Sequence, residues 1–172
     1  MVSVKCLASG SAGNSYAVDD GKSVLLLEAG IRKRTILAGY MDLLMRVQGC
    51  LITHEHQDHA KAALGLPMAG IDVYASGGTF SALNAEKDRR NYRLHSIKAG
   101  EQFTLGTWTV LPWEAQHDAA EPLGFLLHSK ETRDKLIFAT DTYFIPNTFR
   151  GLTYIMVECN YDRTLLDRNI SA

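Results

Sequence analysis

The sequence predicts a mixed α/β protein built as a four-layer αββα sandwich. Strand-like segments flank the helical ones, in the order strands, helix, histidine-rich loop, helix and strands again. At 172 residues the chain is long enough for a single domain with its own core. No repeat, linker or low-complexity segment interrupts it, so we expect one domain over residues 1–172.

The first half of the chain supplies the helices. Apolar runs predict strands, and apolar residues at helical intervals predict helices between them. The expected strands are 1–7, 16–18, 23–27, 47–52 and 72–74, and the expected helices are 31–45, 58–66 and 76–85. Residues 9–15 are rich in glycine and serine and predict a tight hairpin turn, because they lack the Gly-Lys-Ser/Thr of a phosphate-binding loop.

The second half is dominated by short strands that glycine-containing and charged turns separate. We expect strands at 96–101, 103–107, 108–111, 125–128, 136–138 and 154–157, followed by a terminal helix. These strands would form most of the second sheet of the sandwich.

Composition and charge are those of an ordinary soluble protein, with 46% hydrophobic and 22% charged residues. The net charge of −1 gives no global basic field for nucleic acid, although a local basic rim and metal ions can serve instead. No signal segment or membrane-length apolar run is visible. Three cysteines without metal-ligand spacing predict buried, reduced thiols in a cytoplasmic protein: Cys6, Cys50 and Cys159.

Three histidines and two carboxylates fall within residues 54–59, directly after an apolar segment. In an extended loop, His54 and His56 project from the same side, so they can hold one metal ion together. Asp58 and His59 follow where a helix begins and point away from that pair, so they can hold a second ion. Imidazole and carboxylate without thiolate suit zinc, manganese or iron. The alternative is a polar loop with solvated histidines, which so dense a group of ligands disfavours.

The pattern His54-x-His56-x-Asp58-His59 after an apolar strand resembles the signature of the metallo-β-lactamase fold superfamily. That superfamily includes β-lactamases, glyoxalase II and phosphodiesterases such as tRNase Z and RNase J. Further segments resemble one branch of it, the YycJ/WalJ-like hydrolases, which are phosphodiesterases and exonucleases. The matching segments are 9–15, 117–122, 139–142 and 158–162, and the resemblance covers nearly the whole chain.

The resemblance implies a site for one or two zinc ions, with manganese as a second choice of metal. The first ion would be held by His54, His56 and His117, and the second by Asp58, His59 and a bridging Asp141. Asp58 would also be catalytic, because it would orient the nucleophile and move its proton.

Three other positions carry weaker implications. Glu28 stands where the superfamily usually has an aspartate that braces the histidine loop, so we expect an altered brace. Asn14 and Asn160 are candidate substrate contacts. His95 and His128 lack any ligand context and are expected to be structural or surface residues.

The chain departs from the family pattern at its C-terminal end. Relatives of this kind supply one more histidine to the second metal, yet no histidine follows His128. The C-terminal part of the fold is therefore expected to be reduced or missing. The chain could be a naturally short form, a truncated one, or one whose site a partner subunit completes, as in a homo-oligomer.

The implied function is hydrolysis of a phosphodiester in DNA or RNA by a metal-bound hydroxide. Two basic clusters are candidate phosphate contacts or simply solvated surface: Arg32-Lys33-Arg34, and Lys87 with Arg89, Arg90 and Arg93. One alternative is a small-molecule thioester or lactam hydrolase like glyoxalase II. The other is a metal-binding module with little catalysis.

Overall fold

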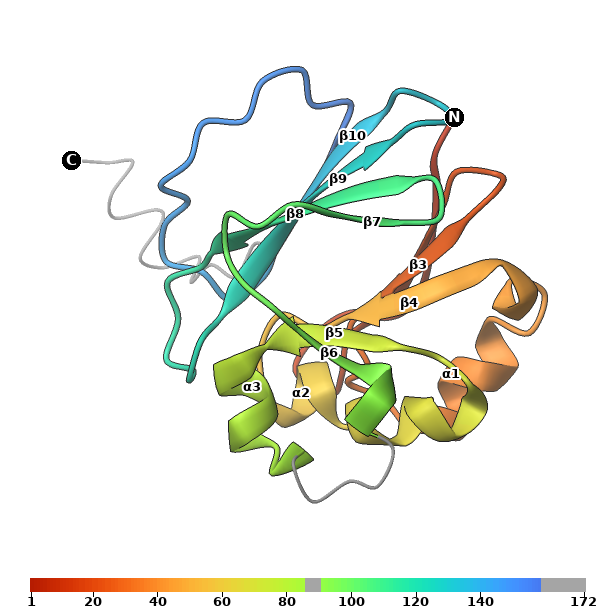
Figure 1. Ribbon diagram of the computed structural model, residues 1–172, viewed down its shortest axis with the longest axis vertical. Coiled ribbons are helices and arrows are strands. Elements are labelled where there is room, and N and C mark those ends of the chain that lie inside the picture. The colour runs from red at the N-terminus through yellow and green to blue at the C-terminus, as the bar shows by residue number, and fades with distance from the viewer. Residues whose placement is uncertain (86–90, 159–172) are drawn as a thin grey trace, which may run out of the picture.

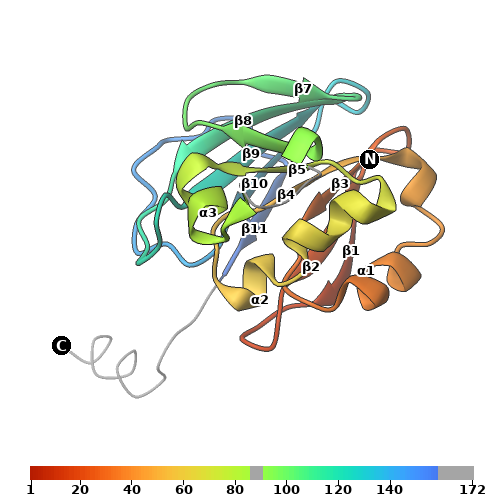
Figure 2. The ribbon, with the colours of Figure 1, turned by 60° about the horizontal axis from the view of Figure 1, so that its bottom comes forward.

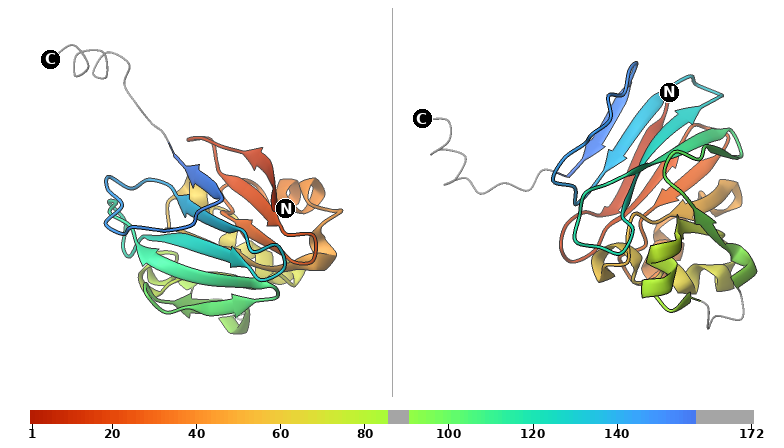
Figure 3. Two further views of the ribbon diagram at one scale, coloured as in Figure 1. Left: turned by 90° about the horizontal axis from the view of Figure 1, so that it is seen from above. Right: turned by 60° about the vertical axis from the view of Figure 1, so that its left-hand side comes forward.

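The computed structural model describes residues 1–85 and 91–158 of the chain. They form two β-sheets packed face to face, with helices against the outer face of the first sheet (Figures 1 and 2). Seen from above, the two sheets lie one over the other (Figure 3). The expected α/β class and the two-sheet sandwich are confirmed.

The first sheet has six strands in sequential order, β1-β2-β3-β4-β5-β6. β1 to β3 are antiparallel and joined by tight turns, whereas β3 to β6 are parallel, as strands joined through helical crossovers must be. Because β3 and β4 are parallel, their C-terminal ends meet at one edge of the sheet. The strands are β1 (Ser3–Ala8), β2 (Ser15–Asp19), β3 (Val24–Leu27), β4 (Val47–Leu51), β5 (Val73–Ser76) and β6 (Leu94–Ile97).

The second sheet has five strands in the order β11-β10-β9-β8-β7. Its pairs are antiparallel except for β10 and β11, which run parallel. The strands are β7 (Phe103–Leu105), β8 (Trp108–Glu114), β9 (Leu123–Ser129), β10 (Lys135–Ala139) and β11 (Tyr154–Val157).

The helices are shorter than the sequence predicts. The expected helix 31–45 divides into α1 (Lys33–Gly39) and the 3-10 helix η1 (Leu44–Arg46). Gly39 lies where the helix passes close to β1, since a Cβ there would come within 2.5 Å of the Leu7 side chain. The expected helix 58–66 divides into α2 (Gln57–Ala60) and the 3-10 helix η2 (Ala63–Ala69), because the Ala62 amide donates instead to the Ala29 carbonyl.

The expected helix from Ser76 is α3 (Gly77–Ala82), which Ser76 caps by accepting a hydrogen bond from the Thr79 amide at 3.0 Å. Another short 3-10 helix within the described residues is η4 (Asn91–Arg93), just before β6. No described helix is both long and apolar enough to cross a membrane.

Alternation along β3 links the two main layers of the core. Val24 and Leu26 face the helices and pack in the cluster that contains Ile36 of α1. Leu25 and Leu27 face the second sheet and pack in the cluster that contains Phe125 of β9. β3 is buried on both faces, which explains its uninterrupted apolar sequence.

The outer face of the second sheet is covered by the loop that follows β10. Ile145, Phe149 and Leu152 of this loop pack against Trp113 of β8 and Ile137 of β10. Within the described residues this loop takes the place of the second helical layer. The terminal helix expected from the sequence lies outside the described residues.

One prediction about the cysteines is wrong. Cys50 is buried in β4, as expected, but Cys6 is exposed. The reason is that Cys6 lies on β1, an edge strand whose side chains are only partly covered. Cys159 lies outside the described residues.

A buried carboxylate joins the two sheets at the end remote from the histidine loop. Asp20, in the turn between β2 and β3, accepts hydrogen bonds from the amides of Lys22 and Ser23 at 2.9 and 2.8 Å. It also accepts from the hydroxyls of Thr107 and Ser129 in the second sheet, at 2.6 and 2.8 Å. Burial alone would raise the pKa of Asp20, but these hydrogen bonds outweigh it and lower the pKa.

We expect Asp20→Ala to destabilise the fold at neutral pH by about 2–3 kcal/mol, because hydrogen bonds to a buried charge are lost and their donors are left unsatisfied. The folded-state pKa is below the unfolded one, so this stability is present above the ordinary aspartate pKa of about 3.9. The difference between wild type and variant should therefore shrink as the pH falls below that value. Urea unfolding across pH measures it, and Asp42→Ala, at an exposed ion pair, is the control expected to change little.

Candidate metal centre

The polar residues of the centre come from the ends of strands in both sheets. The histidine motif, residues 54–59, follows β4, and Glu28 follows β3 in the first sheet. His117 follows β8 and Asp141 follows β10 in the second sheet. All these strand ends lie at the same edge of the sandwich, so residues up to 113 positions apart meet there: Glu28 and Asp141 both adjoin His59.

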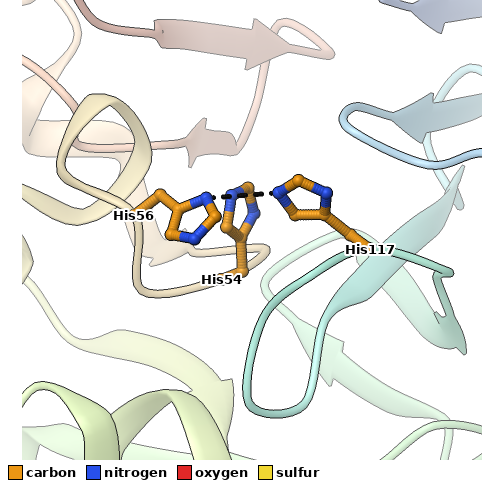
Figure 4. A group of neighbouring side chains, drawn as sticks. All are labelled: His54, His56 and His117. Carbon is orange, nitrogen blue, oxygen red and sulfur yellow. Dashed lines mark hydrogen bonds between the residues drawn. The ribbon is translucent and has the colours of Figure 1, made fainter.

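His54, His56 and His117 form the first group of potential ligands (Figure 4). One nitrogen of each lies within 4.8 Å of the others. His56 Nδ1 and His117 Nε2 are 3.2 Å apart, and the ring centroid of His54 lies 4.7 Å from that of each of the other two histidines, so the three rings form a triangle. His54 is buried, whereas the other two reach solvent. The group is therefore open on one side.

His54, His59 and Asp141 form a second group, again with ligand atoms within 4.8 Å of one another. Asp141 Oδ2 lies 2.7 Å from His59 Nε2 and 3.6 Å from His54 Nε2. The Asp58 carboxylate adjoins this group, with Oδ2 3.3 Å from His59 Nε2. The sequence assigned Asp58, His59 and Asp141 to one ion; the geometry adds that His54 stands between the two groups and belongs to both.

The pKa values of four ionisable side chains in the centre are shifted in different directions: His54, His59, His117 and Asp141. Burial and the neighbouring histidines lower the pKa of His54 to about 2, and the same causes lower the pKa of His117. Burial would also lower the pKa of His59, but Glu28, Asp58 and Asp141 outweigh it and raise the pKa to about 9. Burial and Glu158 raise the pKa of Asp141 to about 6 despite nearby His59. His54 thus offers a neutral imidazole, whereas His59 must lose a proton before it can bind a cation.

The donor set fits a divalent ion. His54 Nδ1 lies 2.8 Å from the Thr53 hydroxyl, so with Nδ1 as donor the Nε2 lone pair is left for a ligand. Among the described residues, His54 Nε2 is buried without a hydrogen-bond partner, as are His59 Nδ1 and Glu28 Oε1. Buried polar atoms are normally satisfied, so the unpaired His54 Nε2 beside other imidazoles and a carboxylate fits the ligation of a divalent cation.

Glu28 and Asp141 both have a backbone conformation that is rare outside glycine, with φ of 64° and 47°. Buried Glu28 directs Oε1 at His59 Nδ1 across 3.7 Å and Oε2 at the Thr53 amide across 3.5 Å. It therefore contacts both ends of the histidine loop, where the sequence predicted a brace. Glu158 accepts from the Asp141 amide at 2.9 Å and so holds the unusual turn of that residue.

Asn14 lies in the hairpin turn between β1 and β2, which has the form that the sequence predicted. Its side-chain amide donates to the carbonyls of Gly10 and Asp58, each at 3.3 Å, and its Oδ1 accepts from the Gly10 amide at 2.9 Å. Asn14 is only 7% exposed. The structure gives it internal partners that position Asp58, so a substrate contact stays a prediction.

Two glutamates that the sequence did not single out hold the loop that carries His117. Glu55 Oε1, within the histidine motif, accepts from the Ala120 amide at 2.7 Å. Glu121 Oε2 accepts from the Gly78 amide of α3, also at 2.7 Å. The only signal for Glu55 was its place between two motif histidines, which does not show which loop it will meet.

A third contact ties the same loop to Asp141. The Thr142 hydroxyl accepts from the Gln116 amide at 3.0 Å, and the Tyr143 amide donates to the Gln116 carbonyl at 3.0 Å. A cleft of about 410 Å3 opens beside these residues and is lined by His117, Asp141, Thr142, Tyr143 and Glu158. The two ligand groups thus border a solvent-filled space.

The other candidate residues from the sequence lie away from the metal centre or outside the described residues. His95 pairs with Asp72 at 3.0 Å and stacks on Tyr74, away from the histidine loop. Arg93 pairs with the same Asp72 at 3.0 Å, so its charge is already compensated. Asn160, Lys87, Arg89 and Arg90 lie outside the described residues.

A protein-family model described as "Beta-lactamase superfamily domain" matches residues 27–166. The chain belongs to the metallo-β-lactamase fold superfamily. Within that superfamily, it is 31% identical over 174 residues to the exodeoxyribonuclease YycJ of Bacillus anthracis. It is 28% identical over 171 residues to the exodeoxyribonuclease WalJ of Streptococcus pneumoniae. The expected resemblance to this branch is confirmed.

Both matches cover 93% of this chain but 63% of the relative, so the chain spans less than two thirds of their length. The metallo-β-lactamase fold protein YhfI from Bacillus subtilis has the same fold, with a TM-score of 0.62 at 14% identity. That match covers 83% of this chain and 62% of YhfI. At so low an identity it supports the fold alone.

We expect zinc titration of the metal-free protein to give one tight and one weaker event, since the first group offers three imidazoles whereas His59 of the second group must first lose a proton. Glu55→Ala should weaken the tight event about 10- to 100-fold, because His117 loses the contact that holds its loop against the motif. Isothermal titration calorimetry measures both events.

Glu55→Gln is the matched control, because its side-chain oxygen can accept the same hydrogen bond. It should bind zinc nearly as the wild type does. Equal losses in the alanine and glutamine variants would contradict a positioning role for Glu55, and two equally tight zinc ions would contradict the weaker second group.

Proposed function

We propose that this protein is a metal-dependent phosphodiesterase that cleaves nucleic acid. The observation that carries the proposal is the meeting of two ligand groups that share His54 beside an open cleft. The proposal is supported by the similarity to two proteins named exodeoxyribonucleases. Fold alone would not support it, because the same fold serves several hydrolytic reactions.

In this proposal His54, His56 and His117 hold one zinc ion, and His59, Asp141 and Asp58 hold a second with the aid of His54. Manganese is the second candidate for both positions, since nitrogen and oxygen donors accept either metal. When bound, such ions supply Lewis acidity toward a phosphoryl oxygen and bring water to a nucleophilic state near neutral pH.

The chain's own residues then orient the reactants. Asp58 stands at the edge of the second group with its carboxylate partly exposed, so it can accept a proton from an attacking water. His117 and Asp141 border the cleft through which a substrate approaches. Tyr143 is 82% exposed at the cleft wall and offers a ring on which a base can stack.

A thioester or lactam hydrolase is the second candidate. Some enzymes of this fold use a cysteine thiolate in the second group, but Asp141 is flanked by Thr140 and Thr142. Asp141 also gives the centre an additional anionic ligand. The third candidate is a metal-binding module with little catalysis.

The test is a cleavage assay with zinc or manganese on end-labelled single- and double-stranded DNA and RNA. We expect cleavage of at least one polymer, together with turnover of bis-p-nitrophenyl phosphate and no useful hydrolysis of a lactam. Asp58→Ala should reduce turnover by about 10²- to 10⁴-fold, because a positioned proton acceptor is lost.

His95→Ala is the control for that variant and should remain near wild type, since His95 pairs with Asp72 away from the centre. Rapid hydrolysis of a thioester or lactam without cleavage of any polymer would favour the second candidate. Metal binding without turnover of any substrate would favour the third.

A further inference from the structure

A basic groove lies on the flank that β1 and α1 form, next to the metal centre. Its volume is about 600 Å3, and its lining consists of Leu7, Arg32, Arg34, Thr35, Ala38 and Gly39. Both arginines are exposed. The close approach of Gly39 to Leu7 makes the floor of the groove apolar and tightly packed. The groove thus combines a positive rim with an apolar floor.

The groove begins at the rim of the metal centre. The Gly30 amide donates to the Asn14 carbonyl at 2.9 Å, and the Asn14 amide donates to the Asp58 carbonyl at 2.7 Å. Arg32 is two residues beyond Gly30, and two residues span at most about 7 Å. A chain-like substrate that leaves Asp58 on this side therefore meets Arg32 first and then Arg34.

The arginines are placed unfavourably for the helix itself. Arg32 occupies the N-cap position of α1, Arg34 lies in its first turn, and no acidic residue accompanies them there. Cations near a helix N-terminus are destabilising, because the backbone amides already carry positive partial charge. Within the described residues the side chain of neither arginine makes a hydrogen bond or an ion pair. Uncompensated positive charge of this kind matches an anionic ligand.

The Lys33 side chain lies on a different face from those of Arg32 and Arg34. Its Nζ lies 3.7 Å from the Met68 sulfur of η2, and its aliphatic stem passes over Gly65. Lys33 is not part of the groove lining. The structure therefore divides the basic cluster of the sequence into two groove residues and one residue on another face.

We propose that this groove binds the single strand of nucleic acid that extends from the scissile phosphodiester. Arg32 and Arg34 contact its phosphates, and the apolar floor receives sugar or base surface. Single strands are bound in this manner by positively charged grooves that follow the backbone. The proposal rests on the proposed function and adds to it the path of the substrate outside the metal centre.

The test compares the wild type, the double variant Arg32→Ala/Arg34→Ala and the matched variant Lys33→Ala, all loaded with zinc. The probe is fluorescein-labelled single-stranded DNA with phosphorothioate linkages, which resist hydrolysis. It is used in two lengths, a dinucleotide and a strand on the order of 10 nucleotides. Fluorescence anisotropy at several salt concentrations gives the affinity and its salt dependence.

The double variant should bind the longer strand several-fold more weakly, and the slope of log affinity against log salt should fall by about 1.4, or 0.7 for each lost phosphate contact. Its melting temperature should be no lower than that of the wild type, because removing the arginines relieves repulsion at the start of α1. Lys33→Ala should keep the wild-type slope. The dinucleotide should show little difference among the three proteins, since it is too short to follow the groove from Arg32 to Arg34.

Two results would contradict the proposed role of the groove while leaving the proposed function intact. One is a double variant that binds the longer strand as the wild type does, and the other is an equal loss in Lys33→Ala. Failure of the wild type to bind or cleave any nucleic acid would instead reject the proposed function, and the groove with it.

Discussion

The metal centre depends on a close approach of three backbone segments at Gly30. A Cβ at this position would overlap the carbonyl oxygen of Asp58, so only glycine fits there. The same carbonyl accepts from the Asn14 amide at 2.7 Å, and the Ala29 amide donates to the His59 carbonyl at 2.7 Å. Main-chain contacts therefore fix the direction of the histidine loop, and the side chains complete a geometry that the backbone has already set.

Backbone strain is concentrated in the same place. Glu28 and Asp141 each end a strand with positive φ, which costs of order 1 kcal/mol or more for a residue with a side chain. The surrounding contacts compensate, since Glu28 donates its amide to the Leu51 carbonyl and Glu158 accepts from the Asp141 amide. Both turns direct a carboxylate toward His59, which a regular strand end would not do.

The sequence was informative wherever a local pattern decides the structure. Buried strands such as β3, the hairpin turn that contains Asn14 and a helix that opens near Ser76 follow from periodicity and glycine content. The helix lengths were not predictable, because α2 ends where the Ala62 amide turns to a carbonyl of a different segment. Exposure of Cys6 was missed for a similar reason, since an edge position is a property of the sheet order.

The candidate site likewise contains residues that the sequence indicates and contacts that it does not. The motif histidines are visible as a cluster in the sequence, and the family resemblance pointed to His117 and Asp141, which meet them in the structure. The hydrogen bond between Glu55 and the Ala120 amide could not be inferred, because it depends on which loop of the second sheet lies opposite Glu55. Likewise, only the path of α1 over η2 separates Lys33 from Arg32 and Arg34.

The hydrogen bonds of Asp20 make one end of the sandwich independent of metal. They join the two sheets through a carboxylate, two hydroxyls and two amides, none of which needs a metal ion. The opposite end of the sandwich is held partly by side chains whose buried nitrogens have no partner within the described residues. The Asp20 end of the sandwich is therefore held together without a metal ion, whereas the geometry of the opposite end is coupled to metal binding.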